Sequence, residues 1–275
     1  MDNNDLVYAK NGGIERLLYI MRSLRDPQTG CPWDREQTFS SIAPYTIEEA
    51  YEVADAIERA DMTDLKGELG DLLLQTVYHA AIGEEQGLFD FHSIADCISD
   101  KMVARHPHVF TNSSQKQSKN KQTQDWEKIK EDERKALNQN GTLDGVALSL
   151  PALTRAVKLQ KRAARVGFDW PEVDNVLDKV SEEIIELTEA KSALHRHEEF
   201  GDLMFVLANL ARHLKIDPEQ SLRDANKKFT RRFSEVEKKL YKKSSAPTLS
   251  NLAEMDALWN GSKVKKNNLI IFVRY

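Results

Sequence analysis

Apolar residues recur every three or four positions through most of the chain, which is the spacing of α-helices that bury one face. Proline and glycine are sparse, and they fall mainly between these segments, where they predict loops. The pattern therefore predicts an all-α protein. We expect helices over Ile14–Arg25, Ile47–Ala60, about Asp64–Glu85, Ile94–Arg105, Leu153–Ala164, Val176–Leu194 and Phe200–Leu214.

The helix expected over Ile47–Ala60 separates apolar from acidic residues. Thr46 is predicted to cap its N-terminus, with Glu49 as the capping-box partner. The acidic residues lie on the arc opposite the apolar ones, so we expect the apolar arc to face the core. Residues expected to be buried on this helix are Ile47, Ala50, Tyr51, Ala54 and Ile57, and those on the next helix are Leu69, Leu72, Leu73 and Val77.

The chain carries one acidic pattern twice. Glu48-Glu49-x-x-Glu52 precedes Glu68-x-Gly70-Asp71, and Glu182-Glu183-x-x-Glu186 precedes Glu199-x-Gly201-Asp202. The first part recurs after 134 positions (48 to 182) and the second after 131 (68 to 199). Lys101 and Arg105 recur as Lys228 and Arg232, 127 positions later (101 to 228). We interpret the repeat as an internal duplication rather than a long repeat array.

A single acidic motif on an amphipathic helix is usually a solvated face. Here the motif recurs in matched surroundings, and carboxylates crowded on one face repel one another unless a cation compensates. Oxygen ligands without a convincing Cys or His cluster favour Mg²⁺, with Mn²⁺ as a substitute, over Zn²⁺. Two short patterns, His106-x-His108 and His195-x-His197, leave a less favoured zinc interpretation.

Mg²⁺ commonly binds through a few carboxylates together with substrate phosphates, so the implied ligand is a nucleotide or a pyrophosphate. The sequence has no GxxxxGK[ST] loop, which argues against P-loop phosphate chemistry. The net charge of −5 does not favour nucleic acid as a partner. Cys31 and Cys97 are too few for a disulfide framework, and neither a leader-like nor a long apolar segment is seen. We expect a cytoplasmic protein without a membrane partner.

The duplication and the composition together predict the domain organisation. Residues 111–124 have no apolar anchor and are typical of a polar linker. We expect an N-terminal helical domain over 12–111, a linker with a connecting helix over 112–145, a C-terminal catalytic domain over 146–262 and an atypical tail over 263–275.

With these motifs in view, the chain resembles the MazG family of nucleoside triphosphate pyrophosphohydrolases, over roughly residues 12–262. The paired acidic motifs carry the resemblance, together with Gly30-Cys31-Pro32-Trp33-Asp34, Gln37-Thr38, Arg105-His106-Pro107-His108-Val109-Phe110 and Val166-Gly167-Phe168-Asp169-Trp170. The resemblance implies a tandem all-α bacterial form that assembles into dimers. It also implies Mg²⁺-dependent hydrolysis of NTPs and dNTPs to NMP and pyrophosphate, with a role in nucleotide-pool housecleaning or stress adjustment.

The resemblance also implies roles for residues of the second acidic copy. Water attacks the α-phosphorus while metal ions neutralise the triphosphate and the departing pyrophosphate. Glu182 or Glu198 would orient or deprotonate that water. The implied metal ligands are Glu183, Glu186, Glu199 and Asp202, and the implied nucleotide-binding residues are Lys179, Lys228, Arg232 and Trp259.

The first copy is a possible second metal site, and its residues are Glu48, Glu49, Glu52, Glu68, Asp71, Lys101 and Arg105. It differs in one cation, because Tyr45 stands 134 positions before Lys179. We therefore expect the second copy to be the main catalytic one. Phe39 stands where many family members have His, and the apolar run Leu269–Val273 does not resemble the family's helical end.

Two other function classes fit parts of the pattern. The acidic faces could belong to a helical scaffold that binds a basic partner, which metal-dependent turnover of NTPs would exclude as the main role. The chain could instead be a narrow dUTPase-like enzyme on the same fold, which a substrate panel would distinguish. Base and sugar preference are not predicted by the sequence.

Overall fold

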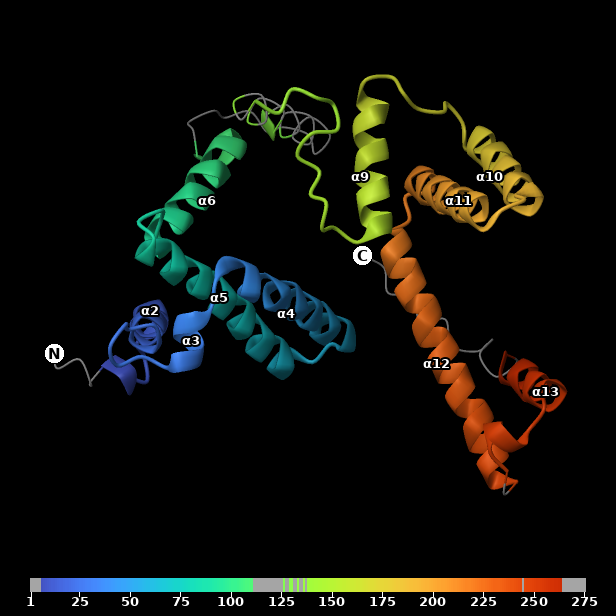
Figure 1. The fold of residues 1–275 in the computed structure, drawn as a ribbon, viewed down its shortest axis with the longest axis horizontal. Helices are drawn as coiled ribbons and strands as arrows, with labels where there is room; N and C mark the ends of the chain where they lie inside the picture. The colour runs from blue at the N-terminus through green and yellow to red at the C-terminus, as the bar shows by residue number, and fades with distance from the viewer. Residues whose placement is uncertain are drawn as a thin grey trace. The chain divides into compact units, whose positions relative to one another are not determined.

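The computed structural model describes residues 6–110, 138–243 and 245–263, together with the isolated positions 126, 129, 130, 133 and 136. The chain divides into two compact units, Met1–Ile129 and Lys130–Tyr275. All regular structure within the described residues is helical, which confirms the all-α prediction (Figure 1). No described helix has the length and apolar character needed to cross a membrane.

The first unit is organised around a pair of long helices, α4 (Phe39–Arg59) and α5 (Met62–Glu85). Ala60 ends α4 in the left-handed conformation (φ 55°), and Asp61 caps α5 by accepting from the backbone N–H groups of Thr63 and Asp64. The chain thus turns back within two residues, so the helices pack side by side (Figure 1). The other helices are α2 (Gly13–Leu24), α3 (Pro32–Glu36), α6 (Phe91–Arg105) and α7 (Pro107–Phe110).

The predicted start of α4 is wrong by two turns. Thr38, not Thr46, is the cap: its Oγ1 accepts from the Ser41 backbone N–H at 3.2 Å, and Ser41 Oγ accepts from the Thr38 N–H at 2.8 Å. This reciprocal capping box starts the helix earlier, and the helix continues through Pro44. Thr46 lies inside α4, where its hydroxyl is 3.4 Å from the Ile42 carbonyl oxygen.

The core of the first unit lies where α2 packs against α4 and α5, and its buried members are Leu18, Met21, Ile42, Val77, Tyr78, Ala81 and Ile82. The segment Gly30–Asp34, which includes the start of α3, is held beside this core. Buried Arg25 donates to Glu85 at 2.6 and 2.7 Å, and the Tyr78 hydroxyl is 2.8 Å from Asp34 Oδ1. These bonds fix the loop that precedes α4.

The second unit repeats the helix pair as α10 (Val173–Glu189) and α11 (Ala193–His213). The helix predicted over Val176–Leu194 is wrong at its end, because the chain leaves the helix at Ala190 and Ser192 caps α11 by accepting from the His195 N–H at 3.1 Å. The predicted start of α11 at Phe200 is therefore two turns late. The remaining elements are α9 (Ala152–Arg165), α12 (Pro218–Lys242), a 3₁₀ turn at Pro247–Leu249 and α13 (Leu252–Lys263).

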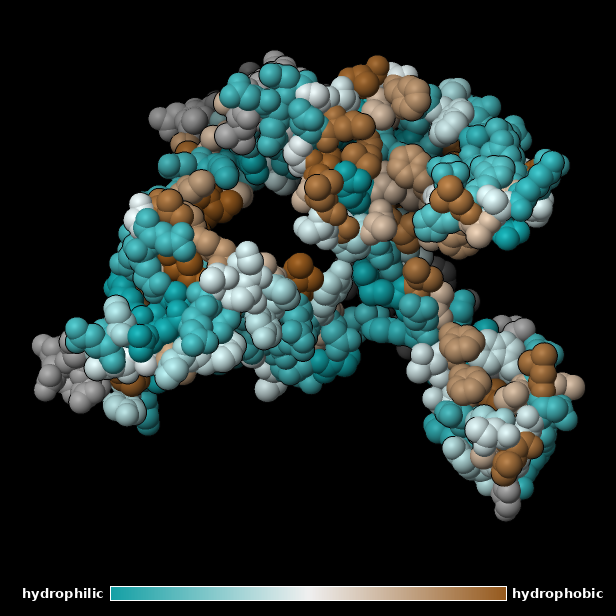
Figure 2. Space-filling model, viewed as in Figure 1, coloured by the Kyte–Doolittle hydropathy of each residue, from teal (hydrophilic) through white to brown (hydrophobic). Residues whose placement is uncertain are grey.

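The predicted burial of α4 is wrong for its large apolar residues. Tyr51 is 50% exposed, and Ile47 and Ile57 are exposed as well. The α4 side chains that are wholly or partly shielded are Phe39, Ile42, Thr46, Glu49, Val53 and Ala56, spaced alternately by three and four. On α5, Val77 is buried and Leu72 partly buried as expected, whereas Leu69 and Leu73 are exposed. Apolar side chains thus reach the surface (Figure 2).

Some predictions fall outside the described residues. The apolar run Leu269–Val273 is one of them, and so is most of the stretch over 112–137 that was assigned to the linker and connecting helix.

Candidate metal centre and its surroundings

Three carboxylates meet between α10 and α11. Oxygen atoms of Glu183, Glu199 and Asp202 all lie within 4.8 Å of one another. Glu183 is only 4% exposed, and Val176 and Ala190, seven residues before and after it, are also buried. Seven residues make two helical turns, so Glu183 occupies the middle of the row by which α10 packs. We call Glu183, Glu199 and Asp202 the second acidic cluster.

The two oxygens of Glu183 have different surroundings. One oxygen, Oε1, lies 2.8 Å from the Lys179 Nζ. The other, Oε2, is buried and has no hydrogen-bond partner among the described residues. A buried oxygen without a partner costs about 1–3 kcal/mol, and a cation would remove that cost. The donor set is carboxylate oxygen throughout, so it fits Mg²⁺ or Mn²⁺.

Lys179 and His195 border this cluster. Lys179 forms ion pairs with Glu182 and Glu183, both at 2.8 Å, and the hydrogen bonds to these two carboxylates raise its pKa. The His195 Nε2 lies 2.9 Å from the Glu199 Oε1. The sequence offered His195 only as half of a zinc pattern; its spacing of four from Glu199 on one helix was the signal for this contact.

The other predicted residues of the second copy lie around the cluster rather than in it. Glu186 is exposed and is not among the three carboxylates that converge. Lost hydration raises the pKa of Glu186, and Lys179 partly opposes this rise. The charges of Glu199 and Glu183 raise the pKa further, so Glu186 lies within electrostatic range of the cluster. Glu182 and Glu198 are both exposed, each next in sequence to a carboxylate of the cluster.

The predicted nucleotide-binding residues on α12 and α13 form a separate group. The Arg232 guanidinium lies 5.8 Å from the centre of the Trp259 ring, and Phe229 is 5.3 Å from the same ring. Lys228 is exposed on α12. Among the described residues, no hydrogen bond or ion pair joins Lys228 or Arg232 to the second acidic cluster.

The first unit holds the corresponding trio, Glu49, Glu68 and Asp71, again with oxygens within 4.8 Å. We call it the first acidic cluster. Burial first, then Glu52 and Asp71, raise the pKa of Glu49. Burial, Glu52 and Asp64 likewise raise the pKa of Glu68. No lysine, arginine or histidine forms an ion pair with this trio in the part of the chain that the structure describes.

The remaining predicted residues of the first copy lie outside the trio. Glu48 and Glu52 are exposed on α4, and Lys101 and Arg105 lie in the last two turns of α6. The two units therefore share the carboxylate geometry and differ in the cation beside it.

Known proteins resemble the chain over most of its length. Residues 37–110 match the MazG nucleotide pyrophosphohydrolase domain. A nucleoside triphosphate pyrophosphohydrolase of Escherichia coli (strain K12) is 51% identical over 93% of this chain and 99% of its own. A nucleoside triphosphate pyrophosphohydrolase/pyrophosphatase MazG of Thermotoga maritima is 40% identical over 92% of this chain and 98% of its own.

A crystal structure of a mazG-related protein from Thermotoga maritima aligns with 42% of this chain and 98% of its own, at 30% identity and a TM-score of 0.37. The sequence similarity alone settles the relationship, because it extends through both units and both acidic clusters. The chain belongs to the MazG family of nucleotide pyrophosphohydrolases.

Proposed function

We propose that this protein hydrolyses nucleoside triphosphates, NTPs and dNTPs alike, to nucleoside monophosphate and pyrophosphate in a Mg²⁺-dependent reaction at the second acidic cluster. The names of its relatives support the reaction class. The single observation that supports this site is the buried, unpartnered Oε2 of Glu183 beside two further carboxylates. Mn²⁺ is the expected substitute. Nucleotide-pool housecleaning or stress adjustment is the cellular role that we propose with it.

In this proposal Glu183, Glu199 and Asp202 hold the divalent cation, and Glu186 is a fourth ligand that joins them once substrate is bound. When bound, the cation supplies neutralising charge for the triphosphate and for the departing pyrophosphate. Lys179 is already fixed at the rim by Glu182 and Glu183, so its ammonium is available to a phosphate oxygen without a large rearrangement.

The attacking water needs an oriented carboxylate at the rim. Glu182 and Glu198 are both exposed beside the cluster. Glu182 is engaged by Lys179 at 2.8 Å, and this contact holds its side chain in one position. Either residue would orient the water toward the α-phosphorus and accept its proton.

Product analysis with purified protein tests the proposal. With Mg²⁺ and a panel of NTPs and dNTPs, we expect NMP and pyrophosphate as the primary products, and we expect excess EDTA to abolish turnover. NDP with orthophosphate, or full activity in EDTA, would contradict it. Activity restricted to dUTP would favour the narrow dUTPase-like alternative, and complete inactivity on the panel would favour a helical scaffold.

We also propose that the protein is a homodimer in which each unit meets its counterpart. The exposed residues Ile47, Tyr51 and Leu69 of the first unit, and Ile184 and Phe200 of the second, are apolar surface on the helix pairs that carry the clusters. Exposed apolar surface of this kind is typical of protein interfaces. Light scattering at micromolar concentration should give about twice the 31.4 kDa of one chain, and a mass near one chain would contradict the dimer.

A further inference from the structure

Helix α9 of the second unit carries lysine and arginine but no aspartate or glutamate. Its opposite arc packs against α11, where the Gln160 Nε2 donates to the Phe205 carbonyl oxygen at 2.8 Å. The cations therefore face away from the helix that carries Glu199 and Asp202. They fall within an arc of about 120° and form what we call the α9 cationic face: Arg155, Lys158, Lys161, Arg162 and Arg165.

The α9 cationic face is open to solvent. Lys158, Lys161 and Arg165 are exposed, and the other exposed residue of α9 is Ala152. Within the part of the chain that the structure describes, no hydrogen bond or ion pair reaches the side chains of Arg155, Lys158 and Lys161. Three cations on one face of a helix thus have no counter-charge.

These cations also repel one another. Like charges three or four residues apart on a helix destabilise it, and Lys158 has such neighbours at Arg155, Lys161 and Arg162. The helix macrodipole favours the cations of the last turn, Arg162 and Arg165, but Lys158 and Lys161 lie before that turn. An anion bound along the face would relieve this repulsion.

The corresponding helix of the first unit has its cations paired. Helix α2 packs against α5 as α9 packs against α11. Glutamates in the last turn of α5 form the pairs Arg22–Glu84 at 3.2 Å and Arg25–Glu85 at 2.6 Å. The last turn of α11 carries Arg212 and His213 and no carboxylate, so it offers α9 no such partner. The unpaired cations therefore distinguish α9 from α2.

The spacing of the charges indicates the kind of anion. From Arg155 to Arg165 the helix rises about 15 Å, so the face carries one cation for about every 3–4 Å. One strand of nucleic acid carries a phosphate for about every 3.4 Å of its axis, whereas an acidic helix with one carboxylate per turn carries a charge for about every 5 Å. A protein partner would also need apolar contact surface, and no exposed apolar residue of α9 is larger than alanine.

We propose that the α9 cationic face binds the phosphodiester backbone of a nucleic-acid strand. Lysine and arginine donate to phosphate oxygens without reading the base sequence. The net charge of −5 disfavours such binding for the surface as a whole, and α9 is a local exception to that average. This binding is independent of the proposed hydrolysis, because an internal phosphodiester presents no triphosphate to the second acidic cluster.

Fluorescence anisotropy of the full chain with a short labelled oligouridylate tests the proposal. The probe has a 5′-hydroxyl end, and EDTA keeps metal ions from both acidic clusters. The test variant is Lys158→Gln/Lys161→Gln, with circular dichroism to confirm folding. The matched control, Lys238→Gln/Lys242→Gln, removes the same charge from exposed positions of α12, where Lys238 pairs with Glu235 at 3.5 Å.

The wild type should bind the probe with a Kd of about 100 µM or tighter at 50 mM salt, the range of non-specific backbone binding. Each neutralised phosphate of a single strand adds about 0.7 to the slope of log Kd against log salt. The test variant should therefore lower that slope by about 1.4, so that between 50 and 200 mM salt the wild type loses about 7-fold more affinity than the variant. The control should keep the wild-type slope.

Weaker binding by the wild type, an unchanged slope in the test variant, or an equal change in the control would overturn the proposal. Displacement of the probe by poly-glutamate or inorganic polyphosphate at a lower charge concentration than by unlabelled oligouridylate would also overturn it, because the face would then suit an acidic protein or a phosphate chain. If the double variant misfolds, Lys161→Gln alone should show half the slope change. NTP turnover does not enter this assay, so failure of the proposed reaction would leave its outcome unchanged.

Discussion

The two acidic clusters each place two glutamates and one aspartate on corresponding helix pairs, yet among the described residues only the second cluster forms an ion pair with a lysine. In the second unit Lys179 contacts Glu183 at 2.8 Å, whereas in the first unit Tyr45 stands 134 positions earlier and is 43% exposed. The uncompensated carboxylates Glu49 and Glu68 have raised pKa values. Two clusters with the same carboxylate geometry can therefore differ in their chemistry. The difference between the two units lies in the lysine beside the cluster, not in the carboxylates.

The largest expected effect is on catalysis. Glu183→Gln or Asp202→Asn should reduce kcat/KM for NTPs by about 100-fold or more, the size of losing one preorganised electrostatic contact in an active site. Glu49→Gln and Asp71→Asn should cost much less, since the first cluster lacks the positioned lysine. The measurement is kcat/KM on several NTPs, with circular dichroism as the folding control. Equal losses in both units would mean that both clusters are catalytic.

The next largest effect is expected from replacing Lys179. Lys179→Met should lower kcat/KM by roughly 10-fold or more, because one charge-assisted contact to the triphosphate is lost, and Lys179→Arg should recover part of it. Tyr45→Lys places a cation at the corresponding position of the first cluster, and it should tighten Mg²⁺-dependent NTP binding there in a Glu183→Gln background. Loss of activity in Lys179→Met that is no larger than in Lys191→Met, an exposed lysine just past α10, would refute a special role for Lys179.

A smaller difference between the two clusters is expected in the stability of the metal-free protein. In EDTA, Glu49→Gln removes one of three mutually repelling carboxylates that have no ion-pair partner among the described residues, so its melting temperature should rise by about 1–3 °C. Glu183→Gln removes the ion pair with Lys179 and should bring no such rise. Scanning calorimetry with and without Mg²⁺ is the measurement. A rise in both variants would show that Lys179 does not compensate the second cluster.

The positions by which α4 and α10 pack explain how much of the two acidic clusters could be predicted from the sequence. Helix type, the repeat and the carboxylates followed from spacing and motif. The burial of Glu183 did not, because acidic residues were assigned to the solvated arc. Yet Ile42, Glu49 and Ala56 are seven residues apart, as are Val176, Glu183 and Ala190. The signal that was missed is a glutamate seven residues from a packed apolar residue on either side. This spacing places the glutamate on the inward face of the helix, opposite to the face that was predicted.

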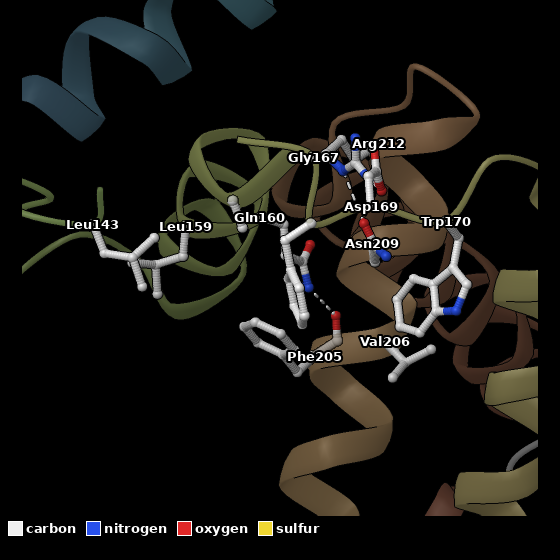
Figure 3. Close-up of a pocket in the computed structure, with 12 residues that line it drawn as sticks. Leu143, Leu159, Gln160, Gly167, Asp169, Trp170, Phe205, Val206, Asn209 and Arg212 are labelled. Carbon is white, nitrogen blue, oxygen red and sulfur yellow. Dashed lines mark hydrogen bonds and ion pairs between the residues drawn. The ribbon is translucent and has the colours of Figure 1, made fainter. Parts of the chain in front are cut away.

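Capping and long-range contacts were harder to predict. Thr38 and Thr46 are both plausible caps, each with a possible capping-box partner three residues on (Ser41 and Glu49), and in the structure Thr38 forms the box with Ser41. A pocket beside α11 is lined by Gln160, Phe168 and Asn209, which are distant in sequence and share no pattern (Figure 3). Such a pocket forms only when α9 and the loop before α10 are packed against α11.

The smallest effect concerns the loops that precede the acidic helices, which the two units hold differently. Arg25 holds the first loop through Glu85, and Asp169 holds the second through Arg212. The folded-state pKa of Asp169 lies below its ordinary value of 3.8, so its contribution is present above that value and is lost as the pH falls through the lowered pKa. Asp169→Asn should lower the melting temperature slightly at pH 7.

The difference in melting temperature between the wild type and Asp169→Asn should then shrink as the pH falls below 3.8. Thermal unfolding followed from pH 7 to pH 3 measures that difference. A gap between wild type and Asp169→Asn that grows on acidification would contradict the assigned direction of the shift.

The proposed reaction depends most on the second acidic cluster holding the divalent cation together with the substrate. The direct measurement is a crystal of the full chain with Mn²⁺ and an NTP analogue that resists α–β cleavage, examined for anomalous scattering from manganese. We expect a peak about 2.0–2.2 Å from oxygens of Glu183, Glu199 and Asp202, with the analogue's phosphates beside Lys179. A peak confined to Glu49, Glu68 and Asp71, or triphosphate bound away from both clusters, would contradict it.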